Sequence, residues 1–368
     1  MRLLAFAALA MFSSAAHADA VPFDGNRWQI IAKESRIEDH AGRKSLFLRA
    51  GLAAVNDSRF LDGVIEFDIS FTGERGFMGV AWRMQEDGQN YEEFYLRPHQ
   101  SGNPDANQYQ PVFNGMEAWQ LHYGERYSAP TRYRLNEWIH VKIVVAGRSA
   151  EVYIDDPETP ALYIEELEHG LGSGAVALTV GPFAPAWYAN FRFEPMDRPP
   201  ELRGKPRPSQ PLPPGIVGSW LVSGAFDGKT LDGKPRLTAA DKRGLAWTRV
   251  TAETSGVANL GRVQGARPGH DTAFARLVVR SDREQVKRLR FGFSDAVRVY
   301  LNDRLLYGGS DGYRSRDYRF LGTIGLFDEL YLPLVKGENT IWLAVTEDFG
   351  GWGVTAQIDD PSGITIVP

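Results

Sequence analysis

Short runs of alternating apolar and polar residues are the feature that most restricts how this chain can fold. In residues 64–71 (VIEFDISF) apolar side chains occupy nearly every second position, and residues 139–145 (IHVKIVV) are aliphatic at every odd position. Successive side chains of a strand point to opposite faces, so this period predicts antiparallel strands with one buried face. No window of 15 residues has a clear period of 3.6, as an amphipathic helix requires. The sequence therefore predicts an all-β protein.

The same pattern continues after a proline-rich segment in the middle of the chain. Residues 195–214 contain eight of the 22 prolines, and proline lacks the N–H that a β-ladder needs. Such a segment is expected to be an extended spacer. We therefore expect two antiparallel β-sandwiches (jelly rolls), at 21–195 and 215–368, joined by a linker at 196–214 that few contacts cross. Five further strands are predicted in the second half: 288–293, 297–301, 330–334, 340–345 and 354–358.

Residues 1–20 have the layout of a secretory signal peptide. Arg2 supplies a positive charge, residues 3–12 are apolar, and Ala-x-Ala sequences end at Ala18 and Ala20. Ten apolar residues are too few to span a hydrocarbon core about 30 Å thick. We expect bacterial-type export to the periplasm or the medium, cleavage after Ala20 and no membrane span.

Composition excludes several classes of function. The chain has no cysteine, which excludes disulfide frameworks, thiolate metal sites and cysteine nucleophiles. Lysine and arginine number 41 against 46 aspartates and glutamates, for a net charge of −5, and no run of basic residues occurs. A nucleic-acid partner is therefore not expected.

One hairpin can be placed in register from its sequence. Residues 76–84 and 90–99 flank a turn at 85–89, and pairing residues whose numbers sum to 174 gives one mostly apolar face. A shift by one residue would mix the two faces, which burial disfavours. The other face is predicted to form a ligand groove, an ordinary solvated face being the alternative. Its large side chains are Arg83, Tyr91, Glu93, Tyr95, Arg97 and His99.

The loop after this hairpin adds groups that suit a carbohydrate ligand. Amides and carboxylates form directional hydrogen bonds with hydroxyl groups, and aromatic faces stack on the apolar side of a sugar ring. Core packing is the alternative for the aromatic residues. The candidate ligand-binding residues of this loop are Asn103, Asp105, Tyr109, Asn114 and Trp119.

Both halves resemble known families. The first half resembles a concanavalin A-like jelly roll of the laminin-G or 3-keto-disaccharide-hydrolase-like (DUF1080) type, in GVIEFDISF, GFMGVAWRMQEDGQNYEEFYLRPH, NEWIHVKIVVAGRSAEVYIDD and GAVALTVGPFAPAWYANFRF. The second half is similar to a galactose-binding-domain-like module, in DAVRVYLNDRLLYGG and LVKGENTIWLAVTEDFGGWGVTAQI. The first resemblance implies a fold shared by lectins, adhesion modules and glycosidases, and the second an accessory module of glycoside hydrolases.

Candidate catalytic residues are few. Glu66 and Asp68 match the start of the E-x-D-x-x-E signature of laminarinase-like jelly rolls, but Phe71 occupies the position of the third acid. Glu66, Asp68 and Glu93 remain candidate acids if they share one polar face, where mutual repulsion would raise one pKa. An acidic surface or a calcium site is the alternative.

The second half offers candidates for a second sugar site. Asp311, Tyr313 and Trp352 lie in glycine-rich loops, with core packing the alternative for Trp352. We expect an exported carbohydrate-binding protein, with a glycan or oligosaccharide as partner and no cofactor other than a structural calcium ion. The first alternative is a glycoside hydrolase, 3-keto-glycoside hydrolase-like, that uses the acids of the groove. The second is an adhesion or scaffold protein.

Overall fold

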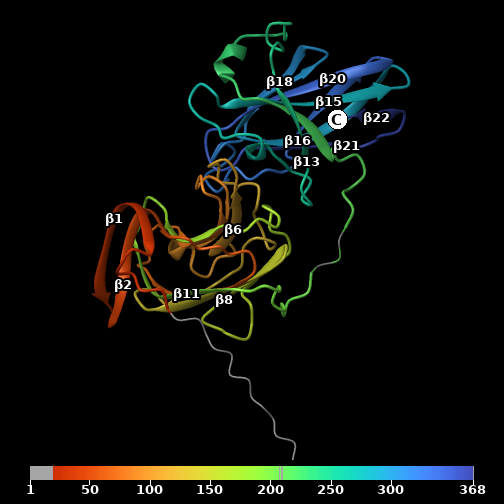
Figure 1. Ribbon diagram of the computed structural model, residues 1–368. Helices are drawn as coiled ribbons and strands as arrows, with labels where there is room; N and C mark the ends of the chain where they lie inside the picture. The colour runs from red at the N-terminus through yellow and green to blue at the C-terminus, as the bar shows by residue number, and fades with distance from the viewer. Residues whose placement is uncertain (1–19, 207, 209, 368) are drawn as a thin grey trace, which may run out of the picture.

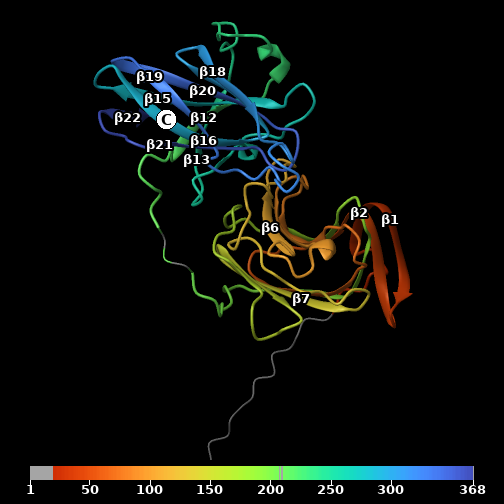
Figure 2. The same ribbon diagram turned by 180° about the vertical axis from the view of Figure 1, so that it is seen from behind.

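The structure is a computed structural model that describes residues 20–206, 208 and 210–367. Figures 1 and 2 show two lobes rich in strands, joined by an extended segment that runs along the outside of the molecule. Their strands pair antiparallel, so the predicted all-β fold of antiparallel sandwiches is confirmed. The proposed signal peptide lies, apart from Ala20, outside the described residues. Within those residues, no helix combines the length and the apolar character that a membrane crossing needs.

One folded-over sheet makes up the first lobe. Its strand order is β6-β5-β4-β10-β2-β11-β3-β7-β8-β9, and β1 pairs with β2 along nearly its whole length. The strands are β1 (Trp28–His40), β2 (Arg43–Val55), β3 (Gly63–Ser70), β4 (Met78–Met84), β5 (Tyr91–Leu96), β6 (Asn107–Val112), β7 (Ile139–Ala146), β8 (Ser149–Ile154), β9 (Leu162–Ile164), β10 (Ala175–Val180) and β11 (Ala186–Pro195), with the short 3-10 helix η1 (Pro98–Gln100) after β5.

Strand β2 connects the two layers of this lobe. Its residues 46–48 pair with β11, whereas its residues 51–54 pair with β10, so one strand belongs to both layers. The change occurs at Gly51, whose φ of 155° is one that side chains rarely adopt. A Cβ atom there would lie 2.1 Å from the carbonyl oxygen of Ile31 on β1. Glycine therefore allows β1 and β2 to approach where the sheet folds over.

The core of the first lobe lies between its two layers. Ile65, Phe67 and Ile69 of β3 belong to the same buried cluster as Val80 of β4 and Phe94 of β5. Each fully buried side chain of this kind contributes about 1.5–3 kcal/mol, so a one-residue shift of any strand would be costly. The alternate residues of the strands point away from this core, and the lobe therefore has two polar outer faces.

A seven-stranded and a four-stranded sheet make up the second lobe. Their orders are β13-β12-β15-β20-β17-β18, with β22 paired to β15, and β14-β21-β16-β19. All five strands predicted in this half are present, as parts of β16, β17, β19, β20 and β21. The elements are β12 (Ser219–Ser223), β13 (Trp247–Thr251), β14 (Ala258–Asn259), β15 (Thr272–Ser281), β16 (Gln285–Ser294), β17 (Ala296–Leu301), β18 (Arg304–Ser310), β19 (Asp328–Leu334), β20 (Gly337–Thr346), β21 (Gly353–Ile358) and β22 (Ile364–Val367), with the 3-10 helices η2 (Gly228–Leu231) and η3 (Leu260–Arg262).

The two lobes are joined by hydrogen bonds to one segment of the first lobe. The backbone N–H of buried Gln120 donates to Gly350 at 3.1 Å, and its side-chain amide donates to the carbonyl oxygen of Leu321 at 2.8 Å. The side-chain oxygen of Gln120 accepts a hydrogen bond of 2.8 Å from the Ser294 hydroxyl. The Tyr123 hydroxyl donates to Ile324 at 2.9 Å. The second lobe therefore fixes the position of the segment around Gln120.

Charged residues are also buried between the lobes. His122 Nε2 lies 2.9 Å from the Glu253 carboxylate, and Arg262 bonds both Glu253, at 3.0 Å, and Glu168. His122 and Glu168 belong to the first lobe, and Glu253 and Arg262 to the second. The prediction that few contacts cross between the two halves is therefore wrong, since composition signals a spacer but not how the sandwiches dock.

Candidate functional site

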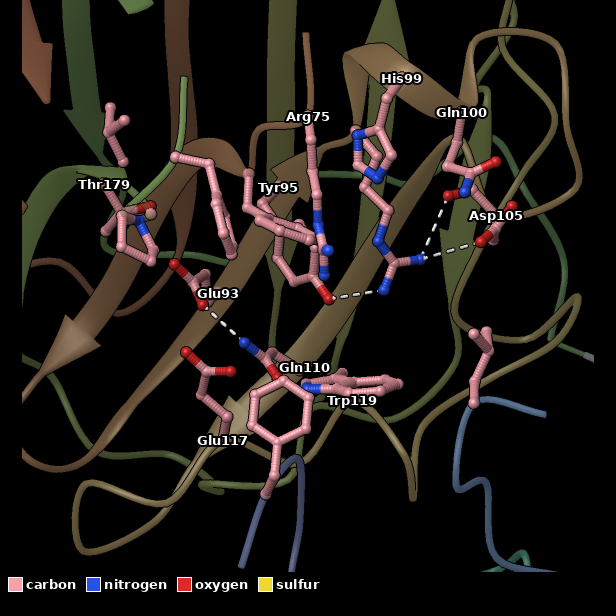
Figure 3. A pocket seen from close by; sticks show the side chains of 18 of the residues that line it. Arg75, Glu93, Tyr95, His99, Gln100, Asp105, Gln110, Glu117, Trp119 and Thr179 are labelled. Carbon is pink, nitrogen blue, oxygen red and sulfur yellow. Dashed lines mark hydrogen bonds and ion pairs between the residues drawn. The ribbon is translucent and has the colours of Figure 1, made fainter. Parts of the chain in front are cut away.

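A cavity of about 630 Å³ lies on one outer face of the first lobe, and loops of the second lobe close it. Strands β5, β6 and β10 supply Glu93, Tyr95, Gln110 and Thr179, which are among the side chains drawn in Figure 3. Tyr313, Arg314, Leu321 and Phe349 reach the cavity from the second lobe. The cavity therefore belongs to both lobes.

The register predicted for the hairpin is confirmed. Met78 pairs with Leu96, Val80 with Phe94 and Trp82 with Glu92, as the sum of 174 requires. Phe94 and Leu96 enter the core, whereas alternate side chains of the same segment line the cavity. The lining residues of this segment are Tyr91, Glu93, Tyr95, Arg97 and His99.

Two carboxyl groups occur together in the cavity. Glu93 accepts a hydrogen bond of 2.8 Å from Gln110, and Figure 3 shows Glu117 beside it. Burial raises the pKa of Glu93, although hydrogen bonds from Gln110 and Thr179 oppose the shift. Burial by the cavity walls and the charge of Glu93 raise the pKa of Glu117 to about 7. Glu117 remains accessible to solvent from the cavity, so it can exchange a proton near neutral pH.

A basic group lies near Tyr95. The Arg97 guanidinium donates to the Tyr95 hydroxyl at 2.9 Å and to the Asp105 carbonyl oxygen at 3.1 Å, and its ion pair with the Asp105 carboxylate is 3.6 Å long. Burial and the charges of Arg97 and Arg75 lower the pKa of His99. The His99 ring is therefore neutral at neutral pH, and two arginines give this part of the cavity its positive charge.

Aromatic rings from both lobes meet in the cavity. Trp119 lies with its ring centroid 5.6 Å from that of Phe349, and Phe349 lies 6.1 Å from Tyr313. The side-chain amide of buried Gln108 donates a hydrogen bond of 2.9 Å to the carbonyl oxygen of Trp119. Its oxygen accepts a hydrogen bond of 3.0 Å from the Tyr95 hydroxyl. The positions of Tyr95 and Trp119 are thus linked through one amide. Seven aromatic residues line the cavity: Phe77, Tyr91, Tyr95, Trp119, Phe183, Tyr313 and Phe349.

Arg83 does not belong to this face, and its assignment as a ligand-binding residue is wrong. Its φ of 53° breaks the strand alternation, and its side chain is 0% exposed. The guanidinium instead donates to three loop carbonyl oxygens, of Leu61, Gly147 and Gly170, at 2.6–2.9 Å. Asp62 lies 3.3 Å from it. Arg83 therefore has a structural role, because its hydrogen bonds connect three loops of the first lobe.

Three candidates from the loop also lie outside the cavity lining. Tyr109 packs in the core and donates its hydroxyl to Glu92 at 2.6 Å. Asn103 is exposed and donates to Gln100 at 2.6 Å. Asn114 donates to the carbonyl oxygen of Gly261 at 2.8 Å and so contributes to the contact between the lobes. The assignment of the fully buried Tyr109 as a ligand-binding residue is wrong. Asn103 and Asn114 do not line the cavity, whereas Asp105 and Trp119 do.

The predicted second sugar site is not formed. Trp352 is 0% exposed, and its ring N–H donates to Val345 at 3.1 Å inside the second core. The buried Asp311 carboxylate accepts two hydrogen bonds from Arg316, at 2.7 and 2.8 Å. Of these three residues, Tyr313 lines the cavity on the first lobe.

Glu66 and Asp68 do not share a face with Glu93, which corrects that prediction. They point outward from β3, whose other side chains enter the core, and β3 belongs to the layer that does not line the cavity. Arg192 donates to Glu66 at 2.6 Å, and His140 lies 2.7 Å from Asp68, which Arg43 and Asn190 also bond. Each of the two carboxylates is therefore paired with at least one cationic side chain.

Several cavity residues were not among the candidate ligand-binding residues: Arg75, Phe77, Gln110, Glu117, Thr179, Phe183, Arg314, Leu321 and Phe349. Gln110 continues the alternation of β6 beside Glu93, a signal that could have identified it. Glu117 stands in a loop without periodicity, so no local pattern marks it.

No family model and no curated protein matches this chain. Among solved structures, the carbohydrate binding module CBM66 from Bacillus subtilis is similar over 46% of this chain and 95% of its own, with 16% identity and a TM-score of 0.36. A putative glycosyl hydrolase from Parabacteroides distasonis covers 46% of this chain and 89% of its own, with 14% identity and a TM-score of 0.33. The beta-glucanase of Bacillus licheniformis is similar over 50% of this chain and 99% of its own, with 11% identity and a TM-score of 0.33.

Proposed function

We propose that this protein binds carbohydrate in the cavity between its two lobes. The observation that carries the proposal is the lining, which combines seven aromatic rings with carboxyl, amide and hydroxyl groups. Aromatic faces stack on the C–H side of a sugar ring, while the polar groups select its hydroxyls. The volume of about 630 Å³ lies within the range of about 300–1,000 Å³ that is common for ligand sites.

Substitution of the aromatic wall tests this proposal. Trp119→Ala should weaken glycan binding about ten-fold, because a stacked ring contributes on the order of 1–2 kcal/mol. The matched control is Trp138→Ala, since Trp138 packs beside His40 and lies outside the cavity lining. Titration calorimetry on a panel of oligosaccharides measures both. Equal binding by a Tyr95→Ala, Trp119→Ala double variant that remains folded would contradict the proposed site.

The two carboxyl groups make hydrolysis the second candidate function. Glycoside hydrolysis requires one protonated acid to protonate the leaving oxygen and one carboxylate to act as base or nucleophile. Glu117, with its pKa of about 7, suits the acid, and Glu93, whose charge contributes to that raised pKa, is the neighbouring carboxyl group for the second role. The 3-keto-glycoside hydrolase-like reaction expected from the sequence would use this pair in place of Glu66 and Asp68.

Conservative substitution distinguishes binding from hydrolysis. Glu117→Gln keeps the shape and removes the proton donor, so a hydrolase should lose at least about 10²-fold in turnover while still binding glycan. Glu66→Gln is the control, because Glu66 lies on the other face and should leave turnover unchanged. Equal turnover in Glu117→Gln would contradict the catalytic assignment. A scaffold protein would bind none of the oligosaccharides.

Export and the boundaries of the parts belong to the same proposal. We propose a signal peptide at 1–20, a concanavalin A-like jelly roll at 21–195, a linker at 196–214 and a galactose-binding-like sandwich at 215–368. Expression with residues 1–20 intact, followed by N-terminal sequencing of the secreted protein, tests the first boundary. A mature chain that starts at Val21 is expected, and a chain retained in the cytoplasm with Met1 would contradict export.

A further inference from the structure

The charges of the cavity are distributed unevenly. Glu93 and Glu117 lie together on one side of Tyr95, and Figure 3 shows His99 and Asp105 on its other side, with Arg75 beside the Tyr95 ring. Burial and, after it, the nearby charges of Arg97 and Arg75 lower the pKa of His99, whereas burial and the nearby charge of Glu93 raise that of Glu117. A ligand in this cavity therefore meets a positive field at one end and acids at the other.

Arg75 is the cation on the first lobe's side of the cavity that remains available to a ligand, and Arg314 reaches the cavity from the second lobe. Its guanidinium lies 4.6 Å from the ring centroid of Phe183 and 5.9 Å from that of Phe77, which orients it over an aromatic surface. Within the part of the chain that the structure describes, its side chain forms no ion pair and donates no hydrogen bond. A guanidinium offers five N–H donors, so Arg75 can bind two oxygens of one anionic group in two-point contact.

Arg97 and His99 lie at the same end of the cavity as Arg75. They add a positive charge and a hydrogen-bond donor there without forming an ion pair with the Arg75 guanidinium. Arg97 is buried and held by Tyr95, Gln108 and Asp105, so it contributes charge from a fixed position. His99 accepts a hydrogen bond at Nδ1 from the Gly76 N–H at 3.4 Å, which leaves the proton of the neutral ring on Nε2 as a further donor. The negative charge of Asp105 balances the positive charge of only one of the two arginines, Arg97.

We infer that the ligand is an acidic glycan whose anionic group, a carboxylate or a sulfate, binds at Arg75 while its hydroxyls reach Glu93 and Glu117. This inference rests on the proposed carbohydrate function and adds the charge class and the direction of the ligand. The reverse direction would bring the anion against two carboxyl groups, where the repulsion is strongest. Trp119 and Tyr95 then hold the sugar ring between the two ends.

Matched pairs of glycans test the inference. Oligogalacturonate is compared with its methyl ester, which keeps the sugar and removes the charge, and a carrageenan oligosaccharide is compared with its desulfated form. At least one acidic member should bind ten-fold or more tightly than its neutral counterpart, and this preference should decrease with added salt. The pair that shows the preference identifies the anion as carboxylate or sulfate.

Variants assign the preference to one residue. Arg75→Gln should bring the acidic and neutral members to within about three-fold of each other, whereas Arg59→Gln, an exposed arginine outside the cavity lining, should retain the preference. Equal binding of both members in every pair, or a preference that persists in Arg75→Gln, would overturn the inference. If neutral glycans still bind and Trp119→Ala weakens them, the proposed function survives alone. If no glycan binds, both fail.

Discussion

The acidic residues on the two polar faces of the first lobe differ in their ion pairing and in the direction of their pKa shifts. On the face that carries β3, Glu66 and Asp68 are paired with Arg192, His140 and Arg43. Burial would raise the pKa of Glu66, but hydrogen bonds from His140 and Arg192 outweigh it and lower that pKa to about 2. On the cavity face, none of the residues that the structure describes forms an ion pair with Glu93, and burial raises its pKa.

This difference separates acids that hold the fold together from acids that are free to act on a ligand. The paired acids stay ionised throughout the physiological range, so they exchange no proton with a substrate. Acids with raised pKa values cost stability when they ionise, and such groups concentrate at functional sites. The sequence motif of Glu66 and Asp68 suggested catalysis, but their cationic partners, which lie on β2, β7 and β11, were not visible in it.

The largest effect is expected where two buried acids depend on one cation. Arg262 bonds both Glu168 and Glu253 between the lobes. Arg262→Met leaves these carboxylates with His122 alone and should destabilise the protein by about 3–5 kcal/mol, the usual result of breaking a buried pair. Urea unfolding followed by tryptophan fluorescence measures this. The control Arg288→Met removes an exposed pair with Asp359 and should cost at most about 1 kcal/mol.

This variant also tests whether the second lobe organises the cavity. Glu117 and Trp119 lie in the segment that Gln120 fixes to the second lobe, next to His122. Loosening that segment should weaken glycan binding under conditions in which both lobes remain folded. If Arg262→Met binds glycan as the wild type does, the contact between the lobes stabilises the protein without shaping its site.

A smaller effect should separate the two faces directly. Asp68→Asn removes a charge that His140, Arg43 and Asn190 all bond, and it should cost about 2 kcal/mol at pH 7. Glu93→Gln, the matched change on the cavity face, should leave stability unchanged or slightly higher, because it removes a charge that burial disfavours. Urea midpoints of the two variants provide the comparison. A larger loss in Glu93→Gln than in Asp68→Asn would reverse the roles assigned to the two faces.

Local periodicity explains which parts of the site could be predicted. The alternation of β5 placed Glu93, Tyr95 and Arg97 on one face, because a strand with one buried side allows only one register. The hairpin of β1 and β2 has no counterpart among the predicted strands, since β1 is exposed along most of its length and lacks a clear alternation.

The remaining parts of the site depend on contacts between distant segments. Glu117 lies in an aperiodic loop, and the second lobe sets its position through Gln120. Arg83 has a positive φ within its strand, and no glycine beside it in the sequence would have predicted this conformation. In the loop after β20, the sequence left Trp352 open as either an exposed ring or a core residue; Trp352 fills the core, and Phe349 of the same loop reaches the cavity. Such outcomes follow from packing between the sheets, which residue type alone does not determine.

The smallest effect is the dependence of stability on pH that Glu117 of the cavity face should cause. The pKa of Glu117 rises from 4.5 to about 7 on folding. A carboxyl group with a raised folded pKa contributes its full stability below pH 4.5 and loses it as the pH rises through about 7. Glu117→Gln should therefore gain stability relative to wild type between about pH 4.5 and 7 and keep a constant difference above that. The shift of Glu168 is present in both proteins and cancels.

The opposite face supplies the control for this measurement. Glu66 has a folded pKa of about 2, so its contribution is present above pH 4.5 and is lost only in strong acid. The difference between Glu66→Gln and wild type should accordingly stay flat between about pH 4.5 and 6, where the Glu117→Gln difference already changes. Above about pH 6.5 it should shrink, because Glu66 helps to raise the pKa of His140 from 6.5 to about 9. Urea unfolding at half-unit steps of pH measures both. A flat Glu117→Gln difference would mean that solvent in the cavity hydrates Glu117 as bulk water does, and the acid role assigned to it would lose its physical basis.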